Sequence, residues 1–167
     1  MMDVPMRIDD ELYKLAVALG RVAQERGVRV ATAESCTGGL VAGAITAVAG
    51  SSDWFDSGFI TYSNEAKIGQ LAVPTAIIEQ FGAVSEETAL SMAQGALGAS
   101  RAQWAIAVTG IAGPAGGTPE KPVGTVCFAW VGPGIAEASR IRLGGDRAAI
   151  RRESVRIALE GILDHLA

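Results

Sequence analysis

One short segment, residues 31–40 ("ATAESCTGGL"), places a hydroxyl group and two glycines where a predicted strand ends and a predicted helix begins near Thr37. Ser35 is a candidate nucleophile for acyl transfer, because the free backbone N–H groups at a helix start stabilise a phosphate or a developing oxyanion. Gly38 and Gly39 would let a ligand approach this backbone closely. The alternative is structural: Ser35 or Thr37 caps the helix, and the glycines allow tight packing on the sheet.

A second segment, residues 62–67 ("YSNEAK"), offers groups that can take the proton of a serine nucleophile. The single histidine, His165, is expected in the last turn of a C-terminal helix as a surface residue, which disfavours a histidine base. Serine–lysine pairs are a known alternative. Tyr62 at a strand end and Lys67, one helical turn beyond Asn64, are predicted to lean towards one site. Lys67 must be neutral to act as a base, so burial must lower its pKa; a solvated lysine on a helix surface is the structural alternative.

Residues 109–124 ("TGIAGPAGGTPEKPVG") form a Gly- and Pro-rich connection that is too long for an ordinary loop. Long ordered loops are commonly functional, and the alternative is a flexible lid without specific contacts. Thr109 and Gly110 end a buried strand and are candidates for further N–H or hydroxyl donors, while Lys121 could reach an anion from the rim. Arg147 follows "GGD" at a helix start, where it could bind a phosphate bidentately or form a surface ion pair.

Other chemistries have less support in the sequence. Cys36, beside Ser35, is a rival nucleophile that thiol alkylation would reveal. There is no GxGxxG motif, and "GPAGGTPEKP" departs from the phosphate-loop pattern, which argues against a Rossmann dehydrogenase and a P-loop nucleotidase. There is also no HExxH and no cluster of His, Cys or carboxylate residues, so no metal site is predicted.

Composition and charge favour one domain that binds a small molecule. The chain has 167 residues, of which 49% are hydrophobic and 19% charged, enough for a single domain over residues 1–167 with its own core. The formal net charge is −4 and no run of Lys or Arg occurs, so neither nucleic acid nor a membrane is an expected partner. Two cysteines without CxxC spacing fit a reducing cytoplasm, and "MMDVPMRIDDEL" has no apolar signal-peptide core.

The hydrophobic patterns predict helices that alternate with strands. Helices are predicted over 10–24, over 40–48, over 64–99 in pieces broken at Pro74 and Gly82, and over a C-terminal stretch capped by Asp146. Strands are predicted over 28–34, 58–63, 104–110, 124–131 and 137–143. The last two strands are expected to form a hairpin. The fold class is therefore α/β, a single-domain α/β/α sandwich with a mixed sheet whose strand order the sequence does not give. Ligands of such sheets bind beyond the carboxyl ends of strands, where Ser35 is expected.

The same residues resemble a known family. The segments "AESCTGGL", "SGFITYSNEAK", "GAVSEETA", "TGIAGPAGGTPEKPVGTV" and "GGDRAAIR" are similar, in this order, to the CinA C-terminal domain family, over nearly the whole chain from about residue 10. The resemblance implies that the protein hydrolyses the carboxamide of nicotinamide mononucleotide to nicotinate mononucleotide and ammonia. It implies no metal and no organic cofactor.

The resemblance also assigns residues. It implies Ser35 as the nucleophile, with Tyr62 and Lys67 assisting its deprotonation. The residues expected around the nucleotide, without a decision on which holds the phosphate, are Thr37, Gly38, Gly39, Asn64, Thr109, Gly110, Lys121 and Arg147. It further implies a homodimer, and longer members carry an N-terminal pyrophosphatase-type domain whose activity is not expected here. A catalytically silent nucleotide-binding module is the alternative function.

Overall fold

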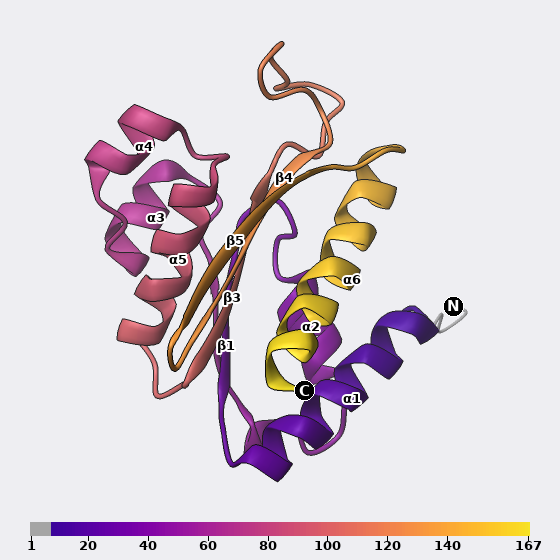
Figure 1. The fold of residues 1–167 in the computed structure, drawn as a ribbon. Helices are drawn as coiled ribbons and strands as arrows, with labels where there is room; N and C mark the ends of the chain where they lie inside the picture. The colour runs from indigo at the N-terminus through magenta and orange to yellow at the C-terminus, as the bar shows by residue number, and fades with distance from the viewer. Residues whose placement is uncertain (1–7) are drawn as a thin grey trace, which may run out of the picture.

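A computed structural model describes residues 8–167 as a five-stranded mixed sheet between two layers of helices (Figure 1). The strands are β1 (Val30–Glu34), β2 (Phe55–Ile60), β3 (Trp104–Gly110), β4 (Thr125–Gly132) and β5 (Ile135–Arg142). Their order is β2-β1-β3-β4-β5; β1 is parallel to β2 and β3, whereas β3, β4 and β5 pair antiparallel. The predicted mixed sheet and α/β/α sandwich are confirmed. Residues 1–7, to which most of the prediction about a signal peptide applies, lie outside the described residues.

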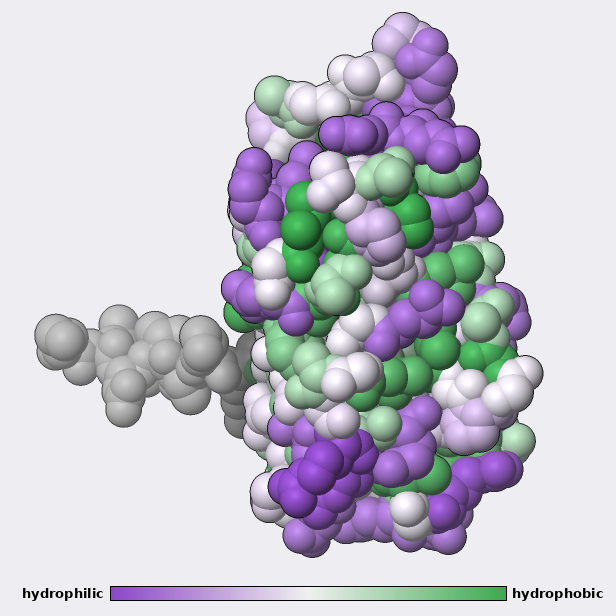
Figure 2. Space-filling model, turned by 90° about the vertical axis from the view of Figure 1, so that its left-hand side faces the viewer, coloured by the Kyte–Doolittle hydropathy of each residue, from purple (hydrophilic) through white to green (hydrophobic). Residues whose placement is uncertain are grey.

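Helices cover both faces of the sheet. One layer consists of α1 (Asp10–Arg26), α2 (Leu40–Thr46) and α6 (Arg147–Leu166), and the other of α3 (Asn64–Leu71), α4 (Thr75–Phe81) and α5 (Glu86–Gly98), while a short 3-10 helix, η1 (Ser51–Asp53), precedes β2 (Figure 1). The predicted breaks at Pro74 and Gly82 separate the three helices of the second layer. On that side of the molecule, hydrophobic and hydrophilic residues are interspersed over the surface (Figure 2).

The two faces of the sheet differ in side-chain size. The face toward α1 and α6 carries large side chains such as Phe128 and Trp130, and Trp54, the residue before β2, belongs to the same core cluster. The sheet residues that face α5 are mostly alanines: Ala31, Ala33, Ala105, Ala107 and Ala129. Small side chains let α5 lie close to the sheet, because helix–sheet distance follows the volume between the backbones.

Local caps fix three helix ends, and the predicted cap at Asp146 is confirmed. Asp146 Oδ1 accepts from the Ala149 N–H at 2.9 Å, and Ser85 Oγ accepts from the Thr88 N–H at 3.1 Å. Helix α1 ends at Gly27, whose φ of 65° places it in the left-handed region. The strand predicted over 58–63 instead ends at Ile60, so Tyr62 follows the strand rather than ending it.

The prediction that His165 is a surface residue is wrong. Its side chain is 15% exposed, and its ring centroid lies 6.0 Å from those of both Trp104 and Trp130. The last turn of α6 packs on the sheet because Leu166 and Ile162 are buried in the core. Within residues 8–167, no helix combines the length and the apolar character needed to cross a membrane.

Candidate active site

Ser35 follows β1 directly, at the carboxyl edge of the parallel part of the sheet. Its N–H donates to Val108 O of β3 at 2.9 Å, which extends the pairing by one residue beyond the strand. Because successive side chains of extended backbone alternate between the faces, Ser35 continues the side of Ala31 and Ala33 and points toward the layer of α3. The residue is buried, with 8% of its surface exposed.

Lys67 of α3 brings an amine to this hydroxyl. Its Nζ lies 3.0 Å from Ser35 Oγ and donates to Thr61 O at 2.8 Å. Helix α3 starts where Ser63 caps it, since Ser63 Oγ accepts from the Ala66 N–H at 3.0 Å. The cap fixes the helix start and so places Lys67 on the inward side of the first turns.

The surroundings of Lys67 favour its neutral form. The residue is 1% exposed, and it forms no ion pair with any carboxylate of residues 8–167. Burial lowers the pKa of Lys67, and the nearby Cys36 opposes this with a smaller effect. The alternative of a solvated lysine is therefore wrong. A neutral amine within hydrogen-bond distance of a hydroxyl is the arrangement that general-base activation requires.

Glu34, which was not predicted from the sequence, holds the turn after Ser35. Its buried carboxylate accepts from Thr37 Oγ1 at 2.7 Å, from the Val41 N–H at 2.9 Å and from the Ala42 N–H at 3.0 Å. Helix α2 begins at Leu40 rather than near Thr37; the Leu40 N–H donates to Thr37 O, and those of Val41 and Ala42 donate to this carboxylate. The expectation that these N–H groups face a ligand is wrong. A glutamate at the end of a fully buried strand is the sequence signal that could have indicated a buried acceptor.

One backbone donor beside the nucleophile is available. Ser35 O accepts from the Gly38 N–H at 3.0 Å. The carbonyl and N–H of a trans peptide point in opposite directions, so the N–H of Cys36 points away from Gly38. Cys36 lines the same pocket as Ser35, and no oxygen of residues 8–167 accepts from its N–H. Beside Ser35, this N–H is the candidate donor to an oxyanion.

A pocket of about 260 Å³ opens over Ser35. The residues that line it are Ser35, Cys36, Tyr62, Gly110, Ile111, Ala112, Gly113, Ala115, Gly116 and Arg147. Four residues predicted from the sequence therefore meet here: Ser35, Tyr62, Gly110 and Arg147. The long connection between β3 and β4, which projects beyond the sheet in Figure 1, forms one wall of this pocket.

Tyr62 and Arg147 bind each other at the rim of the pocket. Arg147 Nη2 donates to the Tyr62 hydroxyl at 3.0 Å, and Arg147 Nη1 donates to Gly113 O at 2.8 Å. The hydroxyl of Tyr62 thus contacts a guanidinium rather than Ser35 or Lys67. Tyr62 is 61% exposed, so its ring is open to a ligand.

Three predicted residues lie away from the pocket. Thr109 Oγ1 donates to Ala83 O at 2.8 Å, because Thr109 faces the α5 side of the sheet. Lys121 Nζ donates to Phe81 O at 2.5 Å, at the end of α4. Asn64 is exposed at the start of α3 and does not line the pocket.

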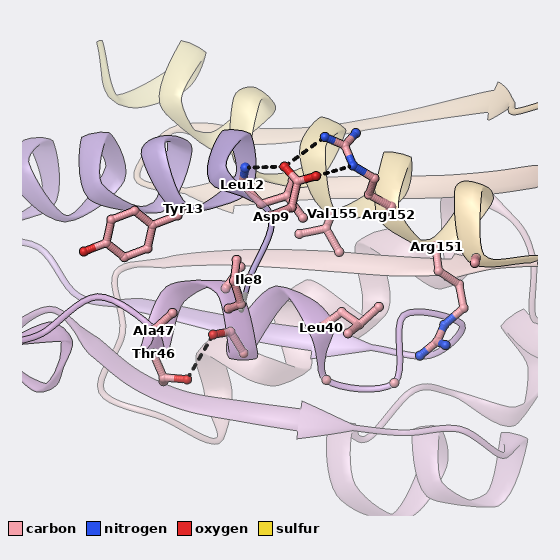
Figure 3. Close-up of a pocket in the computed structure, with 15 residues that line it drawn as sticks. Ile8, Asp9, Leu12, Tyr13, Leu40, Thr46, Ala47, Arg151, Arg152 and Val155 are labelled. Carbon is pink, nitrogen blue, oxygen red and sulfur yellow. Dashed lines mark hydrogen bonds and ion pairs between the residues drawn. The ribbon is translucent and has the colours of Figure 1, made fainter. Parts of the chain in front are cut away.

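Thr37, Gly38 and Gly39 lie behind the nucleophile rather than over it. Thr37 is fully buried, whereas Gly38 and Gly39, with φ of 57° and 98°, line a separate groove of about 890 Å³ between α1, α2 and α6 (Figure 3). Arg151 of α6 reaches this turn and donates to Cys36 O at 3.1 Å and to Thr37 O at 3.3 Å. Arg151 is the second functional residue that the sequence analysis missed, since no local pattern predicts a contact across 114 residues.

Cys36 is a poor rival for Ser35. It is buried, and burial raises the pKa of its thiol to about 12, so the nucleophilic thiolate is scarce at neutral pH. Cys127 is buried as well, and both thiols are free. Among the described residues no group of three or more His, Cys, Asp or Glu side chains could hold a metal ion.

The fold and the site together define a class: an α/β/α domain with a serine hydroxyl and a buried lysine amine in contact at the carboxyl edge of parallel strands. The serine–lysine pair is one of the known forms of a hydroxyl nucleophile with its base. The chain belongs to the CinA C-terminal domain family, whose model matches residues 12–166.

Named relatives and a solved structure support this membership. The nicotinamide-nucleotide amidohydrolase PncC of Pseudomonas putida is 49% identical, over 92% of this chain and 96% of its own length. The protein of the same name from Escherichia coli strain K12 is 51% identical, over 91% of this chain and 93% of its own length. The crystal structure of the competence/damage inducible protein CihA from Agrobacterium tumefaciens is 48% identical, with a TM-score of 0.92 over 96% of this chain and 98% of that chain. The family resemblance predicted from the sequence is confirmed.

Proposed function

We propose that this protein hydrolyses the carboxamide of nicotinamide mononucleotide to nicotinate mononucleotide and ammonia. The observation that carries the proposal is the 3.0 Å contact between Ser35 Oγ and the buried amine of Lys67, beside a pocket that Ser35 lines. The names of relatives with about half of their residues identical support the choice of substrate.

In the proposed reaction Ser35 Oγ attacks the amide carbon, and the serine proton passes to Nζ of Lys67. The carbonyl oxygen becomes an oxyanion that the Cys36 N–H stabilises; one such donor is worth about 2.7 to 4 kcal/mol in serine hydrolases. The C–N bond then breaks, and the leaving nitrogen takes the proton from Lys67 and departs as ammonia. Water, deprotonated by Lys67, hydrolyses the acyl-enzyme and restores Ser35.

We assign the binding of the nucleotide to the rim of the pocket. Arg147 has N–H groups beyond the two that bind Gly113 and Tyr62, and a guanidinium pairs well with a phosphate. The exposed ring of Tyr62 suits the positively charged pyridinium ring of the substrate, which is attracted to an aromatic face. Help from Tyr62 in the proton transfer stays a prediction, because its hydroxyl contacts Arg147 here.

Ammonia release from nicotinamide mononucleotide by the purified protein tests the proposal. We expect Ser35→Ala to lower turnover by more than about a thousandfold, as loss of a serine nucleophile does elsewhere. Binding of the mononucleotide, measured by calorimetry, should change little, because the hydroxyl acts on the transition state. Ser52→Ala, at an exposed serine of η1, is the matched control and should behave as wild type.

Two results would contradict the proposal. Undiminished turnover in Ser35→Ala would remove the serine mechanism. Binding of the mononucleotide without ammonia release by the wild-type protein would instead indicate a catalytically silent nucleotide-binding module.

We also propose that the protein acts as a homodimer in the cytoplasm. The family resemblance implies the dimer, and exposed apolar side chains such as Leu40 and Ile60, at 43% and 52%, could form part of an interface. Both cysteines are free, as is usual in a reducing compartment. Sedimentation equilibrium tests the dimer: a mass that stays at the 17.2 kDa of one chain over a wide concentration range would overturn it.

A further inference from the structure

Arg151 approaches the turn after Ser35 from the side opposite the pocket. Figure 3 shows its side chain pointing from α6 toward the segment before α2, at the end of the groove between α1, α2 and α6. It donates to Cys36 O at 3.1 Å and to Thr37 O at 3.3 Å, and within residues 8–167 it forms no ion pair. Its positive charge therefore acts on two carbonyl groups instead of being neutralised by a carboxylate.

A chain of hydrogen-bonded peptide groups links this guanidinium to the nucleophile. Arg151 binds the carbonyl of Thr37; the N–H of the same peptide group belongs to Gly38 and donates to Ser35 O at 3.0 Å. The Ser35 carbonyl shares its peptide group with the N–H of Cys36, which is the available donor beside the Ser35 hydroxyl. The carbonyl and N–H of each trans peptide point in opposite directions, so the two peptide dipoles follow one another, and hydrogen bonds in such a chain polarise each other.

We propose that Arg151 is a positioning residue for the reaction at Ser35, because it orients and polarises the Cys36 N–H that binds the oxyanion. The inference rests on the proposed function of the same site. A charged donor at the start of the chain withdraws electron density from the Thr37 carbonyl and makes each following N–H a stronger donor.

The expected effect is on turnover rather than on affinity. An interaction that strengthens only when the oxyanion forms lowers the barrier from the bound substrate, and its loss lowers kcat with little change in KM. Complete removal of an oxyanion donor costs about a hundred- to a thousandfold in kcat. Loss of Arg151 weakens the donor without removing it, so we expect Arg151→Ala to lower kcat by about 10- to 100-fold, less than complete removal.

The turn should keep its fold without Arg151. Glu34 holds it independently, through its hydrogen bonds from Thr37, Val41 and Ala42. A loss of activity in a folded Arg151→Ala variant therefore reports a loss of polarisation. Thermal unfolding checks that the variant is folded.

Arg152 provides a matched control on the same helix. Its guanidinium donates to Asp9 at 2.9 Å and to Glu11 at 2.6 Å, away from the turn (Figure 3). We expect Arg152→Ala to keep wild-type kcat. Arg151→Lys should recover only part of the activity, since an ammonium does not reproduce the paired contacts of a guanidinium.

Two readouts separate positioning from a purely structural role. Millimolar methylguanidinium can enter the groove of about 890 Å³ and should restore part of the kcat of Arg151→Ala in a saturable manner, without effect on Arg152→Ala. The midpoint of the pH–rate profile should be the same in Arg151→Ala and wild type, because burial sets the pKa of Lys67. A raised KM with unchanged kcat, an equal loss in Arg152→Ala, or failure of the rescue would each overturn the proposal.

A fluorophosphonate probe separates this inference from the choice of substrate. The probe forms a bond between Ser35 Oγ and phosphorus, fluoride leaves, and the serine proton passes to Lys67, while the P=O oxygen lies where the oxyanion would. The labelling rate of Arg151→Ala should fall by about the same factor as kcat. If Arg151→Ala is labelled more slowly than wild type but the wild-type protein releases no ammonia, the substrate assignment fails and the role of Arg151 stands. An unchanged labelling rate in Arg151→Ala refutes that role.

Discussion

The surroundings of Lys67 destabilise its charged form and leave the lone pair of the neutral amine able to accept a proton. The residue is 1% exposed and its contacts are a serine hydroxyl and the carbonyl of Thr61, neither of which carries a charge. An ammonium in such surroundings loses its hydration without gaining an ion pair, which is why burial lowers the pKa. The same burial that weakens the fold keeps a base ready beside Ser35.

The pH dependence of kcat/KM should report this base. Below the lowered pKa of Lys67 the amine is protonated and cannot accept the serine proton, so activity should rise with pH through that pKa and then level off. The midpoint should lie below the ordinary lysine value of about 10.4. Lys67→Met should lose the activity at every pH, whereas Lys14→Met, at an exposed position of α1, should keep the wild-type profile. Rates independent of pH from 5 to 10 would argue that another group accepts the proton.

Sequence reasoning succeeded for the residues whose position follows from local pattern. Ser35 follows a strand that composition and periodicity locate, and Lys67 lies on the helix that follows the next strand, so the sequence supported their approach at one sheet edge as a hypothesis. Glu34 and Arg151 were not predicted, because the role of each depends on partners that only the folded turn brings near. Lys121 illustrates the opposite error: a cation in a glycine-rich loop was expected at the ligand but binds a helix end.

At the scale of elements, the position of Lys67 depends on how closely α3 and α5 pack. Gly95 of α5 faces the last residue of α3: a Cβ at this position would lie 1.9 Å from Leu71 O. Contact with backbone cannot be relieved by a side-chain rotation. The close approach of the two helices therefore requires glycine here.

Gly95→Ala should destabilise the protein although alanine is the better helix former. The gain in helix propensity is about 1 kcal/mol, and overpacking against backbone costs about 1 to 3 kcal/mol or more. Urea unfolding should show a net loss of stability, and displacement of α3 should also lower turnover. Gly98→Ala on the same helix is the control, since a Cβ there meets no atom within 4 Å, and it should be neutral or stabilising. Equal behaviour of the two variants would contradict the packing argument.

Element types were predictable here because the hydrophobic periods are strong and the breaks are marked by Pro74 and Gly82. Strand β3 was predicted with its observed limits, since a continuous apolar run bounded by polar residues leaves little choice. The limits of β2 were wrong at both ends, because pairing with β1 decides where it starts and stops. The strand order was not predictable, as it depends on contacts between segments far apart in the chain.

For the whole molecule, Lys67 should make stability depend on pH. The unfolded chain holds the lysine proton up to its ordinary pKa, whereas the folded protein releases it at a lower pH. Between the two values the unfolded state binds more protons, so the free energy of unfolding rises with pH. Below the lowered pKa the full cost of the buried charge is present.

Comparison with Lys67→Met isolates this contribution, because all other titrating groups are shared. The free energy of unfolding of the variant minus that of the wild type should decrease as pH rises from 6 to 10, measured by urea unfolding. A difference that does not change over this range would mean that Lys67 keeps its proton in the folded protein.

Ser35 and Lys67 belong to the first 71 residues. Arg147 at the pocket rim and Arg151 at the turn after Ser35 both come from α6, a helix of 20 residues. During synthesis on the ribosome, the reactive pair thus emerges long before the segment that completes its surroundings. A nascent chain would stay inert until α6 docks, and a protein cut short by a premature stop codon ahead of Arg147 should hydrolyse nothing.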